Sequence, residues 1–253
     1  YTDPYMRACV NMDQGGAIVD LRPYAAKLKW EVGIGTKHVQ DASYPFLIQE
    51  KYRAGYFTHY AGEGTVRSAK VSYKGEEVDL CLCRTHAAFS EEGKKRILTL
   101  DPVDIEFYDL AVKLQTKIIF EEGSSKIKYE RTILEMSDPN AEVEINEYMV
   151  ACYGTTEYPE DMTGITLGVA KDGEEKTIDY AYKCRDEKLA GASNAYAVIP
   201  AIETRVSLST DATDGEGYIE EGYAFSPMFK LGYKKQIHDK EVISTWLNLE
   251  KAN

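Results

Sequence analysis

Apolar and polar residues alternate most regularly between Val112 and Gly154, in three runs separated by two turn signals. Alternation with a period of two is typical of β-strands that bury one face. Glu122-Gly123 suits a two-residue hairpin loop, and Asp138-Pro139-Asn140 combines a fixed φ with side chains that bond the local backbone. The stretch therefore predicts a three-stranded antiparallel meander.

Two charged residues fall on the apolar faces of this predicted meander. Arg131 lies in the second run and Glu147 in the third, and the register set by the turns places Arg131 opposite Leu114 on one side and Glu147 on the other. A buried ion pair needs good geometry and additional hydrogen bonds to offset desolvation. We interpret the pair first as structural, and alternatively as a carboxylate that Arg131 directs at a ligand hydroxyl.

Short strand patterns separated by turn residues occupy most of the remaining chain. A hairpin of residues 65–73 and 76–86 turns at Lys74-Gly75. Further strands are expected at residues 5–10, 17–21, 27–32, 103–108, 164–170, 177–184, 195–199, 204–208, 223–230 and 242–249. There is no internal repeat and no linker. We predict an all-β fold, a large antiparallel β-sandwich with few or no helices, formed by one domain over residues 1–253.

The charge balance excludes several classes of partner. The chain has 42 acidic and 30 basic residues and a net charge of −12. This excess of negative charge argues against binding to nucleic acid or to an anionic membrane surface. No apolar run approaches the ~20 residues of a membrane helix. We expect a soluble protein with neither nucleic-acid nor membrane partners, and the sequence does not indicate its oligomeric state.

Five cysteines occur without the spacing of a disulfide framework or of a zinc site. We expect reduced thiols and no metal, which favours the cytoplasm over secretion, although Tyr1 in place of Met leaves a removed export signal open. The chain also lacks the glycine-rich, Walker, Gly-x-Ser-x-Gly and His-Glu-x-x-His motifs. We therefore expect no cofactor and no serine-hydrolase chemistry.

The hairpin at Lys74-Gly75 predicts a cluster of basic side chains. Its register sets Arg67 opposite Leu82, and the strand face that contains Leu82 continues as Arg84 and His86. Like charges gathered at one strand end require an anion, a carboxylate or water. An acidic sugar would fit, because Arg binds a carboxylate bidentately and His exchanges a proton near neutral pH. Pairing with the abundant Asp and Glu residues is the alternative.

A second candidate surface is the aromatic segment of residues 44–60, in which Arg53, Tyr56, His59 and Tyr60 are interleaved. In polysaccharide lyases of the jelly-roll kind, a Tyr or His removes the proton α to a uronate. The string from residue 51 to 56 resembles the Lys-Ala-Gly-aromatic strand of alginate lyases. It lies earlier in the chain, however, and the companion Arg-x-Glu-x-Arg and Gln-x-His motifs are absent.

A broader resemblance rests on the early strand Gly15-Gly16-Ala17-Ile18-Val19-Asp20-Leu21 and on the run from Ile118 to Ile133. Together they resemble the galactose mutarotase-like β-supersandwich group. The group implies this fold and includes aldose epimerases, which use a His acid and a Glu base, and the sandwich domains of glycosidases and lyases. Glu147-Tyr148-Met149 stands where an epimerase would place its catalytic His, so the resemblance leaves ring-opening chemistry in doubt.

We predict a carbohydrate-active protein that acts on or binds an acidic, uronate-type sugar. An epimerase or polysaccharide lyase would use His/Tyr proton transfer while Arg holds the acid group. A non-catalytic carbohydrate-binding or structural assembly sandwich is the alternative. The candidate catalytic residues are His86, His59 and Glu147, and the candidate substrate-binding residues are Arg53, Tyr56, Tyr60, Arg67 and Arg84.

Overall fold

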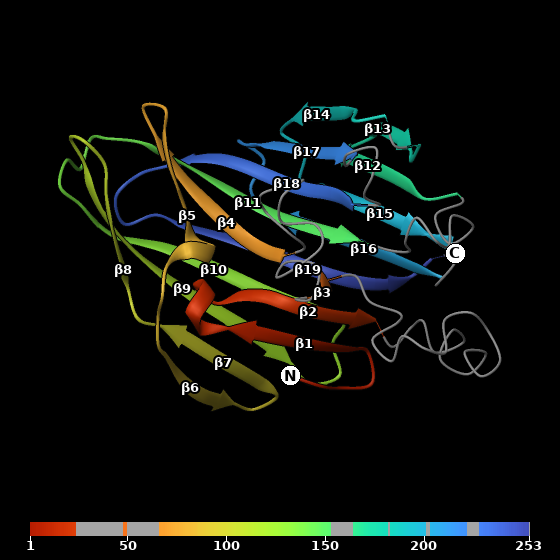
Figure 1. Ribbon diagram of the computed structural model, residues 1–253, viewed down its shortest axis with the longest axis horizontal. Coiled ribbons are helices and arrows are strands. Elements are labelled where there is room, and N and C mark those ends of the chain that lie inside the picture. The colour runs from red at the N-terminus through yellow and green to blue at the C-terminus, as the bar shows by residue number, and fades with distance from the viewer. Residues whose placement is uncertain are drawn as a thin grey trace.

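The computed structural model describes residues 1–23, 48–49, 66–152, 164–181, 183–200, 203–221 and 228–252. Within these ranges, two large antiparallel β-sheets face each other, and the only helices are short 3-10 turns (Figure 1). The predicted all-β sandwich is therefore confirmed. None of the helices in the described part has the length and hydrophobicity that a membrane span requires.

The first sheet has nine strands in the order β1-β2-β4-β11-β18-β17-β14, with β3 beside β2 and β5 beside β4. Its strands are β1 (Met6–Asn11), β2 (Ala17–Pro23), β3 (Ile48–Gln49), β4 (Val66–Tyr73), β5 (Glu76–Asp79), β11 (Val143–Cys152), β14 (Asp186–Ala190), β17 (Glu216–Glu221) and β18 (Met228–Ile237). The 3-10 turns η1 (Met12–Gln14) and η3 (Leu80–Leu82) follow β1 and β5.

The second sheet has ten strands in the order β13-β12-β15-β16-β19-β10-β9-β7-β6, with β8 beside β9. Its strands are β6 (Ala87–Glu92), β7 (Lys95–Leu100), β8 (Val103–Glu106), β9 (Ala111–Glu121), β10 (Lys126–Met136), β12 (Thr166–Lys171), β13 (Glu174–Asp179), β15 (Asn194–Ile199), β16 (Thr204–Thr210) and β19 (Val242–Lys251).

The core lies between the two sheets and is built from alternate residues of each strand. On β10, Ile127, Tyr129 and Ile133 are completely buried, and on β11 so are Ile145 and Met149. Removing these side chains from water is the main force that holds the sheets together. Because successive side chains of a strand point to opposite faces, each sheet also has a second face, which points away from this core.

The prediction that the third strand of the meander pairs with the second is wrong. β9 and β10 form the expected hairpin, but the other neighbour of β10 is β19, and β11 lies in the opposite sheet between β4 and β18. The turn at residues 138–140 therefore carries the chain from one sheet to the other. An alternating pattern specifies that one face is buried, but both sheets bury such a face, so the pattern does not choose between them.

The predicted register of the β9–β10 hairpin is wrong by two residues. Arg131 pairs with Thr116 rather than with Leu114. The connection runs from the end of β9 at Glu121 to the start of β10 at Lys126, and is longer than a two-residue loop. A slip of two keeps every side chain on its predicted face.

The predicted pairing of the β4–β5 hairpin is confirmed near its turn, but it is wrong further from the turn. Val71 pairs with Val78 as expected. The strand then ends, because the Asp79 carboxylate accepts a 2.9 Å hydrogen bond from the backbone N–H of Cys81 and so caps η3. Leu82 consequently lies on η3 and not opposite Arg67, and the predicted common face of Arg67, Arg84 and His86 does not form.

Candidate functional site

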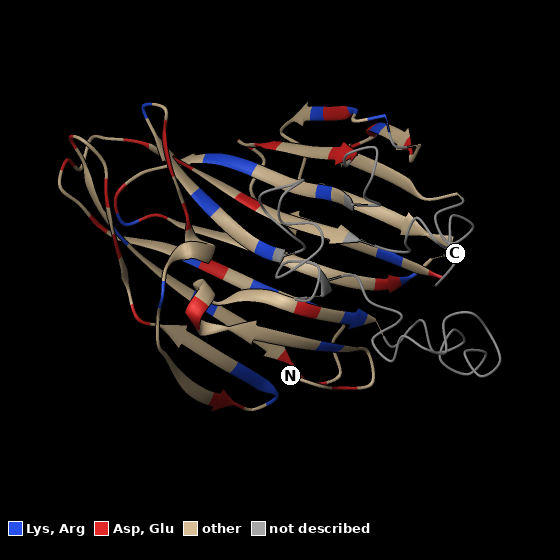
Figure 2. Cartoon of the chain, in the orientation of Figure 1, with Lys and Arg blue, Asp and Glu red and all other residues tan. Residues whose placement is uncertain are grey.

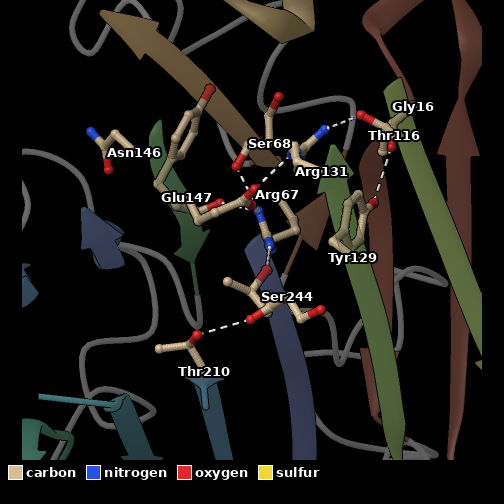
Figure 3. Close-up of polar contacts among 12 residues, drawn as sticks. Gly16, Arg67, Ser68, Thr116, Tyr129, Arg131, Asn146, Glu147, Thr210 and Ser244 are labelled. Atoms are coloured by element: carbon tan, nitrogen blue, oxygen red, sulfur yellow. Dashed lines mark hydrogen bonds and ion pairs between the residues drawn. The ribbon is translucent and has the colours of Figure 1, made fainter. Parts of the chain in front are cut away.

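Three charged side chains meet at the centre of the molecule, between the sheets. Nε of Arg131 on β10 lies 2.6 Å from Oε1 of Glu147 on β11, and Nη1 of Arg67 on β4 lies 2.6 Å from Oε2 of the same carboxylate (Figure 3). All three side chains are buried. The predicted contact of Arg131 with Glu147 is therefore confirmed, but it crosses the interior from one sheet to the other instead of joining neighbouring strands.

Hydroxyl and carbonyl groups accept further hydrogen bonds from the two guanidinium groups, although Nε of Arg67 is buried without a partner among the described residues. Arg131 donates through Nη1 to Oγ1 of Thr116 at 2.7 Å. Arg67 donates through Nη2 to Oγ1 of Thr245 at 2.8 Å and through Nη1 to the carbonyl of Ser68 at 2.6 Å. Bonds of this kind offset the cost of burying charge, which the ion pairs alone would not do.

The ring of Tyr129 lies against both guanidinium groups, with its centroid 4.5 Å from Cζ of Arg67 and 5.1 Å from Cζ of Arg131. Burial raises the pKa of the Tyr129 phenol, so the hydroxyl stays protonated and donates to the carbonyl of Gly16 at 3.0 Å. Burial alone would also raise the pKa of Glu147, but the charges of Arg131 and Arg67 outweigh it and hold that pKa below its ordinary value.

This arrangement is that of a structural cluster. An ionised carboxylate enclosed by two guanidinium groups has no access to a substrate and little tendency to take up a proton. The cluster instead joins β4 and β11 of one sheet to β10 of the other. We therefore leave Arg67 and Glu147, which the sequence had suggested as binding and catalytic residues, out of the proposed site.

Arg84 and His86 are both exposed, and they lie together in a groove of about 400 Å³. The groove is lined by Asn11, Met12, Asp13, Arg84, Thr85, His86, Asp101 and Pro102. Nε of Arg84 lies 3.4 Å from Oδ1 of Asp13, and both of these side chains are largely exposed. The groove thus presents a guanidinium, an imidazole, two carboxylates and an amide to one space.

Thr85 explains why its two neighbours face the groove. Its backbone N–H donates to the carbonyl of Met12 at 3.0 Å, and its hydroxyl donates to the carbonyl of Asp101 at 3.1 Å. Thr85 is buried by these contacts, and the residues on either side of it, Arg84 and His86, are left at the surface. A single anchored residue therefore holds the backbone from which both groove side chains extend.

Gly15 allows the two walls of the groove to approach each other. Its φ is +63°, and a Cβ atom there would lie 1.9 Å from the carbonyl oxygen of Leu80 on η3. Only glycine accepts both this backbone conformation and this contact. The Gly15-Gly16 pair was visible in the sequence as the start of the early strand, but nothing in the sequence indicated that it packs η1 against η3.

The outward face of the nine-stranded sheet carries a second group of polar side chains. The strand register aligns Tyr148, Gly232 and Tyr218 in one row across β11, β18 and β17. Tyr148 donates to a carboxylate oxygen of Asp79 at 3.0 Å, and Tyr218 donates to Oδ1 of Asn146 at 2.8 Å. Both rings are completely buried, so neither is available for stacking on a ligand.

Lysines lie over these tyrosine rings. Nζ of Lys230 is 5.3 Å from the ring centroid of Tyr148 and 5.8 Å from that of Tyr218, and Lys234 lies over Tyr218 at 5.5 Å. Figure 2 shows the positive bands along β18 and β4. We did not identify this surface from the sequence, although the alternation of Lys230 and Lys234 with the apolar residues of β18 was available as a signal.

η3 connects this face with the groove. Cys81 packs with Tyr148 on the sheet face, and Arg84 follows three residues later in the groove. Consecutive Cα atoms are 3.8 Å apart, so these two residues lie within about 11 Å of each other. The backbone after η3 therefore runs from the polar sheet face to the groove.

The other sequence-based candidates, Arg53, Tyr56, His59 and Tyr60, lie outside the described residues. In sequence they fall between β3 and β4, both of which belong to the nine-stranded sheet. Within the described ranges, no group of three or more His, Cys, Asp or Glu side chains is arranged to hold a metal ion.

Comparison with known proteins places the fold in a class. No family model and no curated protein matches the sequence. Solved structures do match, and they show that the chain has the fold of the galactose mutarotase-like proteins, as the sequence resemblance predicted. Identities of 7 to 11% mean that this similarity concerns the fold alone.

Three of these structures illustrate the range of proteins that share the fold. A galactose mutarotase-like protein from Clostridium acetobutylicum has a TM-score of 0.61 and 9% identity, over 100% of this chain and 94% of the other. A putative aldose 1-epimerase from Escherichia coli K12 has a TM-score of 0.56 and 11% identity, over 99% and 97%. The α-N-acetylgalactosaminidase NagBb from Bifidobacterium bifidum, in a GalNAc complex, has a TM-score of 0.61 and 7% identity, over 100% of this chain and 36% of the enzyme.

Proposed function

We propose that this chain binds an acidic carbohydrate in the groove beside η1. The observation that carries the proposal is the convergence of Arg84, His86, Asp13, Asp101 and Asn11 on one open space of about 400 Å³. That volume lies within the ~300–1,000 Å³ of small-molecule sites. Carboxylate, amide and imidazole groups together provide the donors and acceptors that sugar hydroxyls require.

The fold supports a carbohydrate ligand by analogy. The similar structures include one named as a putative aldose 1-epimerase and an α-N-acetylgalactosaminidase in complex with GalNAc. Fold analogy does not assign a site or a reaction. We therefore derive the ligand's chemistry from the side chains of the groove.

We assign to Arg84 the role of binding the acid group of the ligand. Its side chain is 84% exposed, and its contact with Asp13 is a 3.4 Å approach between two exposed groups. Such surface pairs contribute little to stability. A ligand carboxylate can therefore replace Asp13 and accept two parallel hydrogen bonds from the guanidinium.

The reaction assigned to the site, if the site is catalytic, is proton transfer by His86. An imidazole beside a carboxylate that Arg84 has neutralised could remove the proton α to the acid group. In a lyase the released electron pair would form the C=C bond of the unsaturated uronate, while the glycosidic C–O bond β to the acid group breaks and its oxygen takes a proton from a general acid. His59, Tyr56 and Tyr60 remain candidates for its partner, and Arg53 for a further contact with the ligand. In the non-catalytic form of the proposal, the same groups only bind.

Calorimetric titration with trigalacturonate tests the binding proposal. The Arg84→Ala variant should bind about tenfold or more weakly, the effect expected when charge-assisted hydrogen bonds are lost. The methyl-esterified trisaccharide should bind weakly to both proteins. The control is Arg7→Ala, which removes an exposed arginine on β1 that does not line the groove. Equal affinity of wild type and Arg84→Ala for the acid would contradict the proposal.

Product detection separates catalysis from binding. If His86 acts in a lyase, incubation with the same acidic trisaccharide should generate the ultraviolet absorbance of an unsaturated uronate. If it acts in an epimerase, NMR of a free sugar should show its anomers interconverting. His86→Ala should abolish either signal. Saturable binding without either product would leave the non-catalytic form as the function.

A further inference from the structure

β6 is an edge strand of the ten-stranded sheet and lies outside β7 at the lower margin of Figure 1. Two of the other sheet edges carry additional contacts. Residues 1–3 fold back along β1, where Tyr1 and Ala8 exchange two backbone hydrogen bonds of 2.9 and 3.0 Å. β13 and β14 close the opposite end, where Nζ of Lys176 bonds to the carbonyl of Lys188 at 2.7 Å. Among the described strands, β6 pairs with β7 alone, and five of its six residues are exposed.

The register of β6 shows which of its backbone groups are free to pair. The N–H of Asp101 donates to the carbonyl of His86 at 2.8 Å, and Ala87 is aligned with Leu100. In an antiparallel ladder, alternate residues bond to the same neighbour. The even-numbered residues of β6 therefore bond to β7, and the N–H and C=O groups of Ala87, Phe89 and Glu91 point away from the sheet.

We propose that this edge pairs with β6 of a second copy of the chain, antiparallel and about a two-fold axis at Phe89. This register places Phe89 opposite Phe89 and Ala87 opposite Glu91 of the second copy. All of these are positions whose backbone groups point outward, so each pair forms two backbone hydrogen bonds. The two-fold symmetry is that of an isologous dimer, the commonest form of homo-oligomer.

The side chains of β6 favour the same register. Phe89 is 59% exposed, and across the axis it would cover its own counterpart. On the other strand face, His86 stands opposite Glu92 of the second copy, and the symmetry repeats this contact. An axis at Glu91 would place two carboxylates together. An axis at Ala87 would extend the pairing onto Arg84 and Thr85, which precede the strand.

Sedimentation equilibrium of the full chain tests the dimer. The wild type should show a monomer–dimer equilibrium that depends on protein concentration. Phe89→Lys places two like charges on the axis. Glu91→Pro removes an outward N–H and leaves the backbone bonds of the β6–β7 ladder in place, although it also removes the ion pair of Glu91 with Arg96. Each should weaken the dimer by about tenfold or more. The control Tyr108→Lys removes an aromatic side chain that is 95% exposed and should change nothing. A monomeric wild type, or a dimer indifferent to Phe89→Lys, would overturn the proposal.

Disulfide trapping tests the register itself. In a hydrogen-bonded antiparallel pair the Cα atoms are ~5.5 Å apart, which a disulfide can span. Phe89→Cys should therefore give a covalent dimer on mild oxidation, beyond any background from the exposed Cys9 and Cys184 of the wild type. Ser90→Cys, which this register aligns with Ala88 of the second copy and not with its own counterpart, should give much less. Equal trapping at both positions would contradict an axis at Phe89.

Discussion

At the scale of single residues, the most constrained group is the carboxylate of Glu147. It contacts Arg67 and Arg131, one from its own sheet and one from the opposite sheet. Neither arginine has another carboxylate among the described ion pairs. A cluster with two positive charges and one negative charge therefore depends on this single anion in the buried interior.

Replacing Glu147 with Gln should destabilise the protein by about 3–5 kcal/mol, because it leaves two buried guanidinium groups without a counter-charge. Urea unfolding measures the change. Glu144→Gln is the matched control on the same strand, because its carboxylate lies 4.0 Å from Lys234 near the surface. A loss for Glu147→Gln no larger than that for Glu144→Gln would contradict the structural role of the cluster.

The same carboxylate should make stability depend on pH. The two guanidinium groups lower the pKa of Glu147 in the folded protein relative to the ordinary value of ~4.3. Its contribution is therefore fully present above that ordinary value and is lost as the pH falls through the depressed folded pKa. The stability difference between wild type and Glu147→Gln should shrink below about pH 4. A difference that stays constant down to pH 2 would show that the carboxylate is not responsible.

At the scale of secondary-structure elements, the local sequence pattern predicts where strands lie better than it predicts which strands pair. Alternation located β9, β10 and β11, and the glycine turn set the pairing of Val71 with Val78. The pattern missed η3, because Asp79 caps a 3-10 turn in a run of residues that would also suit a strand. The expected cluster of Arg67 with Arg84 failed for that reason, while Arg84 and His86 remained neighbours.

Gly15 tests the packing of η1 against η3. Gly15→Ala should destabilise the protein more than Gly93→Ala does, and should weaken trigalacturonate binding by deforming the groove. Gly93 is a matched control, because its φ of +60° is similar to the +63° of Gly15 but a Cβ atom there would meet nothing within 4 Å. The difference between the two variants, measured by thermal unfolding, isolates the contact with Leu80. Equal destabilisation would contradict that contact.

At the scale of the whole molecule, the sequence predicted the architecture but not the sheet order. Both sheets bury one face of every strand, so an alternating strand such as β11 suits either sheet, and only the long-range contacts decide. The Arg131–Glu147 contact was nevertheless predictable, because a charge on a buried face needs an opposite charge on whichever strand packs against it. The tyrosine and lysine surface over β11, β17 and β18 was predictable only in part, because the lysines alternate along β18 but their approach to Tyr148 depends on β11, which is distant in sequence.

The central claim is that the groove beside η1 binds an acidic carbohydrate. Chemical-shift mapping of the ¹⁵N-labelled chain during titration with trigalacturonate tests it most directly. We predict saturable shifts at Asp13, Arg84, His86 and Asp101, with no comparable change when the methyl-esterified trisaccharide is added. Shifts confined to the outward face of the nine-stranded sheet, at Asn146 and Lys234, would contradict the assignment of the groove.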